Sequence, residues 1–168
     1  MARVIEGRLD ASGLKVAVVA ARFNSLIVEQ LVLGATDTFL RHGGRDSDLT
    51  ITRVPGAFEL GVTAKRLAET GHFDAVVALG AVIRGATSHY DLVCKEAASG
   101  VSRAALDSNI PVLFGVITTD TIEQAMERAG TKAGNKGSDA MMGAIEMAQL
   151  FRGIDGISKR AVQGVVAV

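Results

Sequence analysis

Four short segments of the sequence combine aromatic, polar and small residues in a way that could carry chemistry. They are residues 22–24, 55–59, 83–90 and 114–120. Each follows or closes a run of apolar, β-branched residues, a pattern typical of a strand. In an open parallel sheet, ligands bind beyond the carboxyl ends of the strands. The four segments therefore form one candidate binding region.

The third segment has the features of an anion-binding turn. Residues 84–89 (RGATSH) lead from an apolar run into a predicted helix. The small side chains allow a ligand to approach the backbone, and the first N–H groups of a helix favour an anion. Gly85, Ala86 and Thr87 are therefore candidate phosphate-binding residues. A tight turn with a helix cap explains the same residues, and the Gly-Lys-Ser/Thr ending of a P-loop is absent.

Four side chains in these segments could act on an organic substrate. His89, at the predicted helix start, could exchange protons near neutral pH. Phe23 and Phe58 lie in two strand-end segments, where an aromatic ring can stack on a flat heterocycle. Glu59 could accept hydrogen bonds from a polyol. The alternatives are a surface histidine, phenylalanines packed between helix and sheet, and a solvated glutamate.

Two cations flank a glycine-rich break at residues 130–135. Arg128 precedes the break and Lys136 follows it. A guanidinium grips phosphate in bidentate fashion, whereas an ammonium acts as a point charge. Arg84 is a weaker candidate for the same role. Each of these cations can equally be an ordinary solvated surface residue.

The elements that would position these residues alternate between strands and helices. The apolar runs are residues 14–21, 49–54, 73–82 and 111–117. Helices are expected at residues 25–41 (capped by Asn24 or Ser25), 57–69, 88–106, 120–129 (with a capping box of Asp120 and Glu123) and 138–151. This alternation predicts an α/β fold, a flavodoxin-like doubly wound sheet with four central parallel strands and helices on both faces.

The ends of the chain give weaker signals. Residues 4–9 could form an extra N-terminal edge strand. We expect a single domain over residues 1–153 and a C-terminal tail, residues 154–168, of unknown role.

Composition narrows the class of protein. With 168 residues, 48% hydrophobic and zero formal net charge, the chain can bury a core and offers no basic surface for nucleic acid. One cysteine, Cys94, allows neither an internal disulfide nor a thiolate metal cluster. No apolar run approaches the roughly 20 residues of a membrane span, and no signal core opens the chain. We expect a cytoplasmic protein that binds no metal or membrane and tends to self-associate.

Taken together, five segments resemble the 6,7-dimethyl-8-ribityllumazine synthase family. The segments are residues 22–24, 54–59, 80–89, 114–120 and 123–137, and the resemblance spans residues 5–151 in the family's order and spacing. It implies a transferase of riboflavin biosynthesis that uses no cofactor. Such an enzyme joins 5-amino-6-(D-ribitylamino)uracil to 3,4-dihydroxy-2-butanone 4-phosphate and releases phosphate and water.

The resemblance also implies roles for individual residues. Phe23 would stack on the pyrimidine, Ala57, Phe58 and Glu59 would line the ring and ribityl site, and Val82 and Ile83 would contact the heterocycle through their backbone. Gly85, Ala86, Thr87 and Arg128 would hold the phosphate, and His89 would shuttle protons. Phe114, Arg128 and Lys136 would come from the neighbouring subunit. Ser88 and Tyr90 replace the proline and phenylalanine usual in the family, and Ser88 would cap the helix instead.

Assembly and partners follow from the same resemblance. The family forms homopentamers and, in some members, an icosahedral shell of sixty subunits, and riboflavin synthase is a candidate partner. A non-catalytic flavin- or lumazine-binding container of the same fold remains an alternative, as does a generic flavodoxin-like binder of phosphorylated ligands.

Overall fold

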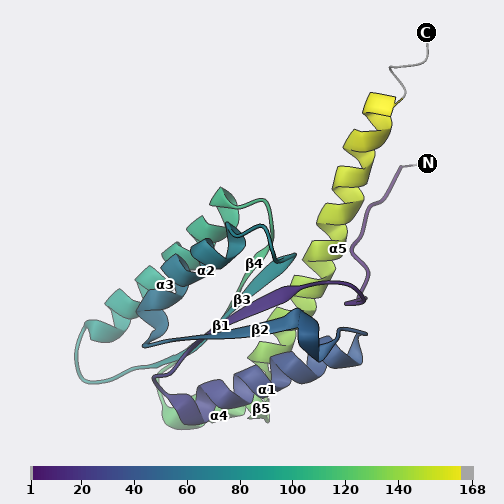
Figure 1. Cartoon of the computed structure of the whole chain (residues 1–168). Helices are drawn as coiled ribbons and strands as arrows, with labels where there is room; N and C mark the ends of the chain where they lie inside the picture. The colour runs from purple at the N-terminus through teal and green to yellow at the C-terminus, as the bar shows by residue number, and fades with distance from the viewer. Residues whose placement is uncertain (1, 164–168) are drawn as a thin grey trace.

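A four-stranded parallel sheet lies at the centre of the computed structural model, which describes residues 2–163 (Figure 1). Its strands are β1 (Val16–Ala21), β2 (Leu49–Val54), β3 (Ala75–Ile83) and β4 (Val112–Thr119), in the order β2-β1-β3-β4. All six residues of β1 are buried. A strand covered on both faces needs such a continuous apolar run. The predicted doubly wound α/β sheet is confirmed.

Helices cover both faces of the sheet and close two separate cores. On one face lie α1 (Ser25–Arg41) and α5 (Lys136–Gln163), and on the other lie α2 (Leu60–Ala68) and α3 (His89–Asp107) (Figure 1). Side chains of alternating strand positions point to opposite faces. Val18 of β1 accordingly packs in the core under α1 and α5, and Val19 packs in the core under α2 and α3.

Short elements connect the long ones. They are the 3-10 turns η1 (Asp46–Asp48) and η2 (Ala57–Glu59), the helix α4 (Ile122–Glu127) and the antiparallel pair β5 (Ala129–Thr131) and β6 (Gly134–Asn135). The predicted break at residues 130–135 is thus a small hairpin. It is held on α1, because the Asn135 amide donates to the Gln30 carbonyl at 2.8 Å. A Cβ on Gly137 would collide with the Leu31 carbonyl, so only glycine allows this approach.

Two helix starts differ from the sequence prediction. Asn24 precedes α1, but its side chain does not cap the helix. The predicted capping box of Asp120 and Glu123 is wrong by one residue. Thr121 Oγ1 accepts from the Gln124 backbone N–H at 3.2 Å, and Gln124 Oε1 accepts from the Asp120 N–H at 2.9 Å.

The N-terminal segment runs beside α5 (Figure 1). Residues 2–8 have no regular secondary structure, so the extra edge strand expected at residues 4–9 is not formed within the described part of this chain. Helix α5 extends past the predicted end at residue 151 to Gln163. Arg152 of α5 pairs with Asp74 at 2.8 Å and donates to the Gly13 carbonyl at 3.4 Å. The proposed tail therefore begins inside a helix, and its last residues, 164–168, lie outside the described chain.

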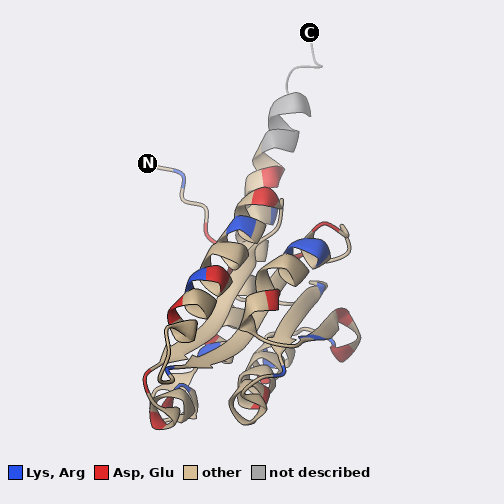
Figure 2. Cartoon of the chain, turned by 90° about the vertical axis from the view of Figure 1, so that its left-hand side faces the viewer, with Lys and Arg blue, Asp and Glu red and all other residues tan. Residues whose placement is uncertain are grey.

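Charges of both signs are interspersed over the helices (Figure 2). Within residues 2–163, no helix combines the length and apolar character that crossing a membrane would require.

Candidate functional site

A cavity of about 570 Å³ opens at the carboxyl end of the sheet. It lies between β1 and β3, where the strand order reverses and where ligands of doubly wound sheets bind. Nine residues predicted for the site line it: Phe23, Ala57, Phe58, Glu59, Val82, Ile83, Gly85, Thr87 and His89. Three of the four predicted segments thus meet in one place.

The loop after β1 presents Phe23 to the cavity. Asn24 has φ 58° and ψ 42°, a left-handed conformation that asparagine tolerates better than most residues. Its side-chain amide donates to the Ala81 carbonyl of β3 at 2.8 Å, and the Phe23 N–H donates to the Pro55 carbonyl at 3.1 Å. The loop is therefore tied to both neighbouring walls, while the Phe23 residue stays 72% exposed.

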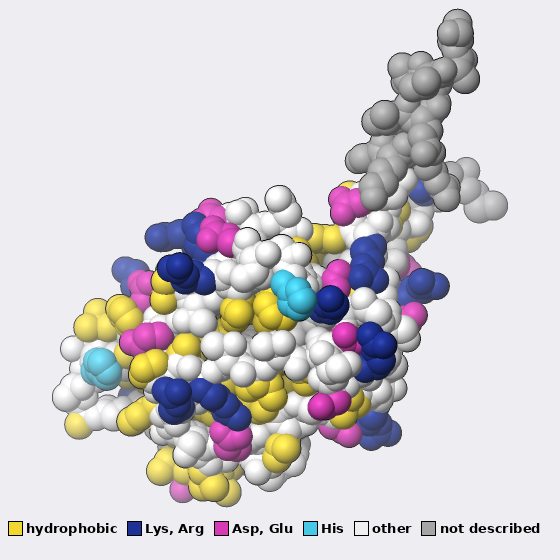
Figure 3. All heavy atoms as spheres, viewed as in Figure 1, with side chains coloured by type: hydrophobic (Ala, Val, Ile, Leu, Met, Phe, Trp, Pro, Cys, Tyr) yellow, Lys and Arg dark blue, Asp and Glu magenta, His cyan; other side chains and the backbone are white. Residues whose placement is uncertain are grey.

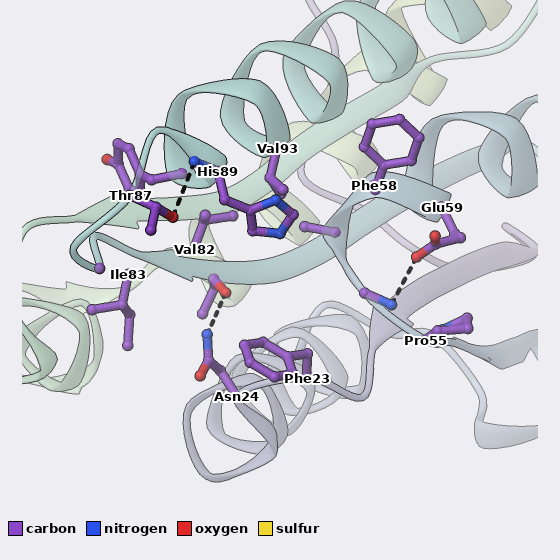
Figure 4. A pocket seen from close by; sticks show the side chains of 15 residues that line it. Phe23, Asn24, Pro55, Phe58, Glu59, Val82, Ile83, Thr87, His89 and Val93 are labelled. Atoms are coloured by element: carbon purple, nitrogen blue, oxygen red, sulfur yellow. Dashed lines mark hydrogen bonds between the residues drawn. The ribbon is translucent and has the colours of Figure 1, made fainter.

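The turn after β2 forms the second wall. Glu59 Oε2 accepts from the Gly56 backbone N–H at 2.9 Å, which fixes the start of η2 (Figure 4). One carboxylate oxygen of Glu59 thus has a structural role, and the carboxylate still lines the cavity. Phe58 is 54% exposed, so its ring is not simply packed between helix and sheet.

The end of β3 forms the floor and leads into the turn that the sequence predicts to bind an anion. β1 pairs with β3 only as far as Leu79, so β3 extends beyond the end of β1. In this extension the Ala81 carbonyl accepts from the Asn24 side chain instead of from a neighbouring strand. Val82 and Ile83 line the cavity here, followed by Gly85 and Thr87. Ala86, the third residue predicted for this turn, is exposed beside the lining residues.

His89 is the first residue of α3 and is exposed. Thr87 Oγ1 accepts from its backbone N–H at 3.4 Å. Ser88 makes no side-chain capping hydrogen bond, so the expectation that Ser88 would cap the helix is wrong. In Figure 4 the imidazole lies between Phe58 and Phe23, which come from two other loops. The arrangement brings together two aromatic rings, an imidazole and a helix start.

Asn24 and Tyr90 lie within the predicted segments but were given no binding role of their own, and the lining residue Val93 lies outside those segments. Val93 follows His89 by one helical turn, so the helical period could have placed it on the same face. Tyr90 is half-buried, and burial raises its pKa above 10.0, so the phenol stays protonated at neutral pH. Burial likewise raises the pKa of the nearby Cys94 thiol, which argues against a thiolate nucleophile.

Besides Ala86, which lies next to the lining residues, three predicted site residues lie outside this cavity. Phe114 is the third residue of the edge strand β4 and is 44% exposed. It does not reach the carboxyl end of the sheet, because β4 continues to Thr119 rather than ending near residue 117. Arg128 follows α4, and its Nη1 donates to the Gln124 carbonyl at 3.0 Å. Lys136 begins α5 and pairs with Asp139 at 2.7 Å.

The positions of the two cations separate them from the cavity of their own chain. The hairpin between Arg128 and Lys136 packs on α1, whereas Phe58 and His89 lie beside α2 and α3. The described residues of one chain therefore bring together Phe23, Phe58 and His89 without these two cations.

Apolar side chains are exposed around this region. Figure 3 shows them at the left and lower edges of the molecule, where α3 begins and where α1 and α4 lie. They include Phe23, Leu26, Leu92, Ile122 and Met126. Apolar surface of this kind often marks an interface or a binding groove.

Residues 13–152 match the family model described as 6,7-dimethyl-8-ribityllumazine synthase. The matched region begins at Gly13 and ends within α5. It contains all the residues that line the cavity, the β5–β6 hairpin and Phe114.

Proposed function

Because the chain belongs to the 6,7-dimethyl-8-ribityllumazine synthase family, we propose that it condenses 5-amino-6-(D-ribitylamino)uracil with 3,4-dihydroxy-2-butanone 4-phosphate. The product would be 6,7-dimethyl-8-ribityllumazine, with phosphate and water released. The observation that carries the proposal is the convergence of Phe23, Phe58 and His89, from three different loops, on one cavity. A generic binder of phosphorylated ligands would not require this combination.

In the proposed reaction, the pyrimidine lies between the walls formed by Phe23 and the turn at residues 55–59. The aromatic ring of Phe23 stacks on the flat pyrimidine ring at low entropic cost. The Glu59 carboxylate accepts hydrogen bonds from ribityl hydroxyls through the oxygen that does not hold Gly56. Val82 and Ile83 at the end of β3 contact the ring with their backbone, because no strand covers β3 beyond Leu79 on that side.

The phosphorylated ketone lies next to the turn at residues 85–87. Small residues and the start of a 19-residue helix provide N–H groups directed at an anion. The aryl amine attacks the ketone to give a Schiff base. Phosphate then leaves, and the nitrogen that bears the ribityl chain closes the second ring on the new carbonyl. His89, between the two reactants, transfers protons in these steps.

Most of the rate acceleration would come from holding the two reactants together. Both are already reactive, and proximity alone can supply roughly 7–11 kcal/mol in ideal cases. A cavity of about 570 Å³ falls in the range of roughly 300–1,000 Å³ usual for small-molecule sites.

The site is proposed to be shared between subunits of a homopentamer, with a sixty-subunit shell as a larger form. The support is the location of Arg128 and Lys136 on the α1 face, away from their own cavity. A neighbouring copy could supply both cations and Phe114, since Phe114 is exposed on an edge strand. Analytical ultracentrifugation tests this, and a fully active monomer would contradict it.

The direct test of the reaction is incubation of the protein with both substrates while the absorbance of the lumazine is followed. Turnover that requires both substrates supports the proposal. Binding of a lumazine or flavin without turnover would identify the protein as a container instead.

A further inference from the structure

We propose that Arg84 is a positioning residue, which fixes the anion-binding turn and the first turn of α3 against the end of β4. The kinetic part of this proposal rests on the proposed function, because it concerns the affinity for the phosphorylated substrate. Arg84 follows directly on β3 and precedes the turn at residues 85–87.

The contacts of Arg84 join both sides of the turn. Its Nε donates to Asp120 Oδ1 at 2.9 Å, at the end of β4, and its Nη1 lies 3.4 Å from Asp91 Oδ1 on α3. The guanidinium carbon lies 4.0 Å from the centre of the Tyr90 ring. A planar guanidinium can stack on a ring and donate in its own plane at the same time, which a lysine ammonium cannot do.

These contacts place Arg84 behind the site rather than in it. Tyr90 lines the cavity, and Arg84 does not. The guanidinium is charged at any working pH, and its hydrogen bond to Asp120 raises its pKa further, in line with a lasting ion pair. Arg84 therefore acts on the substrate through Tyr90 and through the turn, not as a phosphate ligand.

Arg84 also offsets a negative charge beside the turn. Asp91 lies in the first turn of α3, where a carboxylate stabilises the helix but repels a bound anion. The partner cation reduces that repulsion. Loss of Arg84 would free the turn and leave Asp91 unopposed, and both effects weaken phosphate binding.

The test compares Arg84→Gln, Asp120→Asn, Arg84→Lys and the Arg84→Gln/Asp120→Asn double variant. We expect Arg84→Gln to raise the KM for the phosphorylated substrate about fivefold with little change in kcat, as exposed ion pairs and cation–π contacts allow. Asp120→Asn should raise the same KM, and the double variant should be no worse than Arg84→Gln. Arg84→Lys should rescue only part of the loss.

Asp120→Asn separates positioning from direct binding. If Arg84 contacted the phosphate itself, removal of Asp120 would free the guanidinium and lower the KM, and Arg84→Lys would restore most of the affinity. Either result would overturn the proposal. Lys65→Gln is the matched control. It breaks a comparably exposed ion pair, Lys65 with Asp107 at 3.0 Å, in the last turns of α2 and α3, at the other end of α3 from His89.

Two further measurements keep the proposal separate from the proposed function. Calorimetric titration with inorganic phosphate should show the same order of affinities without any turnover. Hydrogen–deuterium exchange of the peptide covering residues 84–92 should be faster in Arg84→Gln than in the parent protein. If the parent protein catalyses no condensation, the proposed function fails, and unchanged exchange in Arg84→Gln would then still refute the positioning role.

Discussion

The backbone N–H of Lys136 donates to the carbonyl of Arg128 at 2.9 Å, so the two cations close the base of the β5–β6 hairpin together. The hairpin is anchored on α1 through Asn135 and Gly137. The backbones of the two residues are thereby tied together. Neither cation lines the cavity of its own chain.

Arg128→Ala should raise the KM for the phosphorylated substrate by about tenfold or more, because a charge-assisted hydrogen bond to phosphate would be lost. The KM for the pyrimidine should change little. Steady-state kinetics with each substrate varied in turn measures both constants. Arg128→Lys serves as the control and should recover part of the loss as a point charge. An Arg128→Ala protein with unchanged affinity for the phosphorylated substrate would refute the assignment.

Mixed assemblies test whether the site is shared. We expect Phe23→Ala/His89→Ala and Arg128→Ala/Lys136→Ala to be nearly inactive alone, since each lacks one half of every site. After unfolding and joint refolding in equal amounts, about a quarter of the sites would combine an intact cavity with an intact hairpin from the neighbour. Activity should return to about that fraction of the parent value.

The control for this experiment is the same pair of variants mixed without unfolding, which should stay inactive while subunits do not exchange. Sites built within one chain would give no recovery after joint refolding. Activity that fails to rise would therefore contradict the shared-site proposal, even if both variants assemble normally in ultracentrifugation.

His89→Ala should lower kcat while leaving measurable turnover. General acid–base catalysis contributes about 10²–10⁴-fold at most, and the larger contribution from proximity does not depend on the imidazole. Both KM values should stay near those of the parent, because the proposed mechanism puts His89 between the reactants and gives it no binding contact with either one. Complete loss of activity with normal substrate binding would show that proton transfer, not proximity, dominates the reaction.

The strands and long helices could be predicted from sequence because each carries its own local pattern. The continuous apolar run of β1 and the glycines after α1 show burial and helix termination directly. Most of the cavity residues lie in segments that one general rule selected, namely that ligands bind at the carboxyl ends of parallel strands. This rule needs only the positions of the strand ends.

Two of the errors arose where a side chain finds its partner far away in the sequence. Asp120 appeared to be a helix cap, but its carboxylate is held by Arg84, 36 residues earlier, and Thr121 caps α4. Asn24 also appeared to be a cap, but its amide reaches Ala81 across the sheet. Local spacing cannot show such contacts, because they depend on which loops the fold brings together.

Asn24 offers a test of how Phe23 is held. Asn24→Ala should raise the KM for the pyrimidine, because the variant loses the amide contact to Ala81 and places a less tolerant residue at φ 58°. Asn24→Gly keeps the backbone conformation available and removes only the amide, so it separates the two causes.

If the hydrogen bond orients Phe23, both variants should bind the pyrimidine more weakly, by about threefold to tenfold for one lost hydrogen bond. If backbone strain alone matters, Asn24→Gly should behave like the parent. Fluorescence titration with the product lumazine measures the affinity without turnover, and Asn24→Ala binding as tightly as the parent would show that the loop holds Phe23 without this contact.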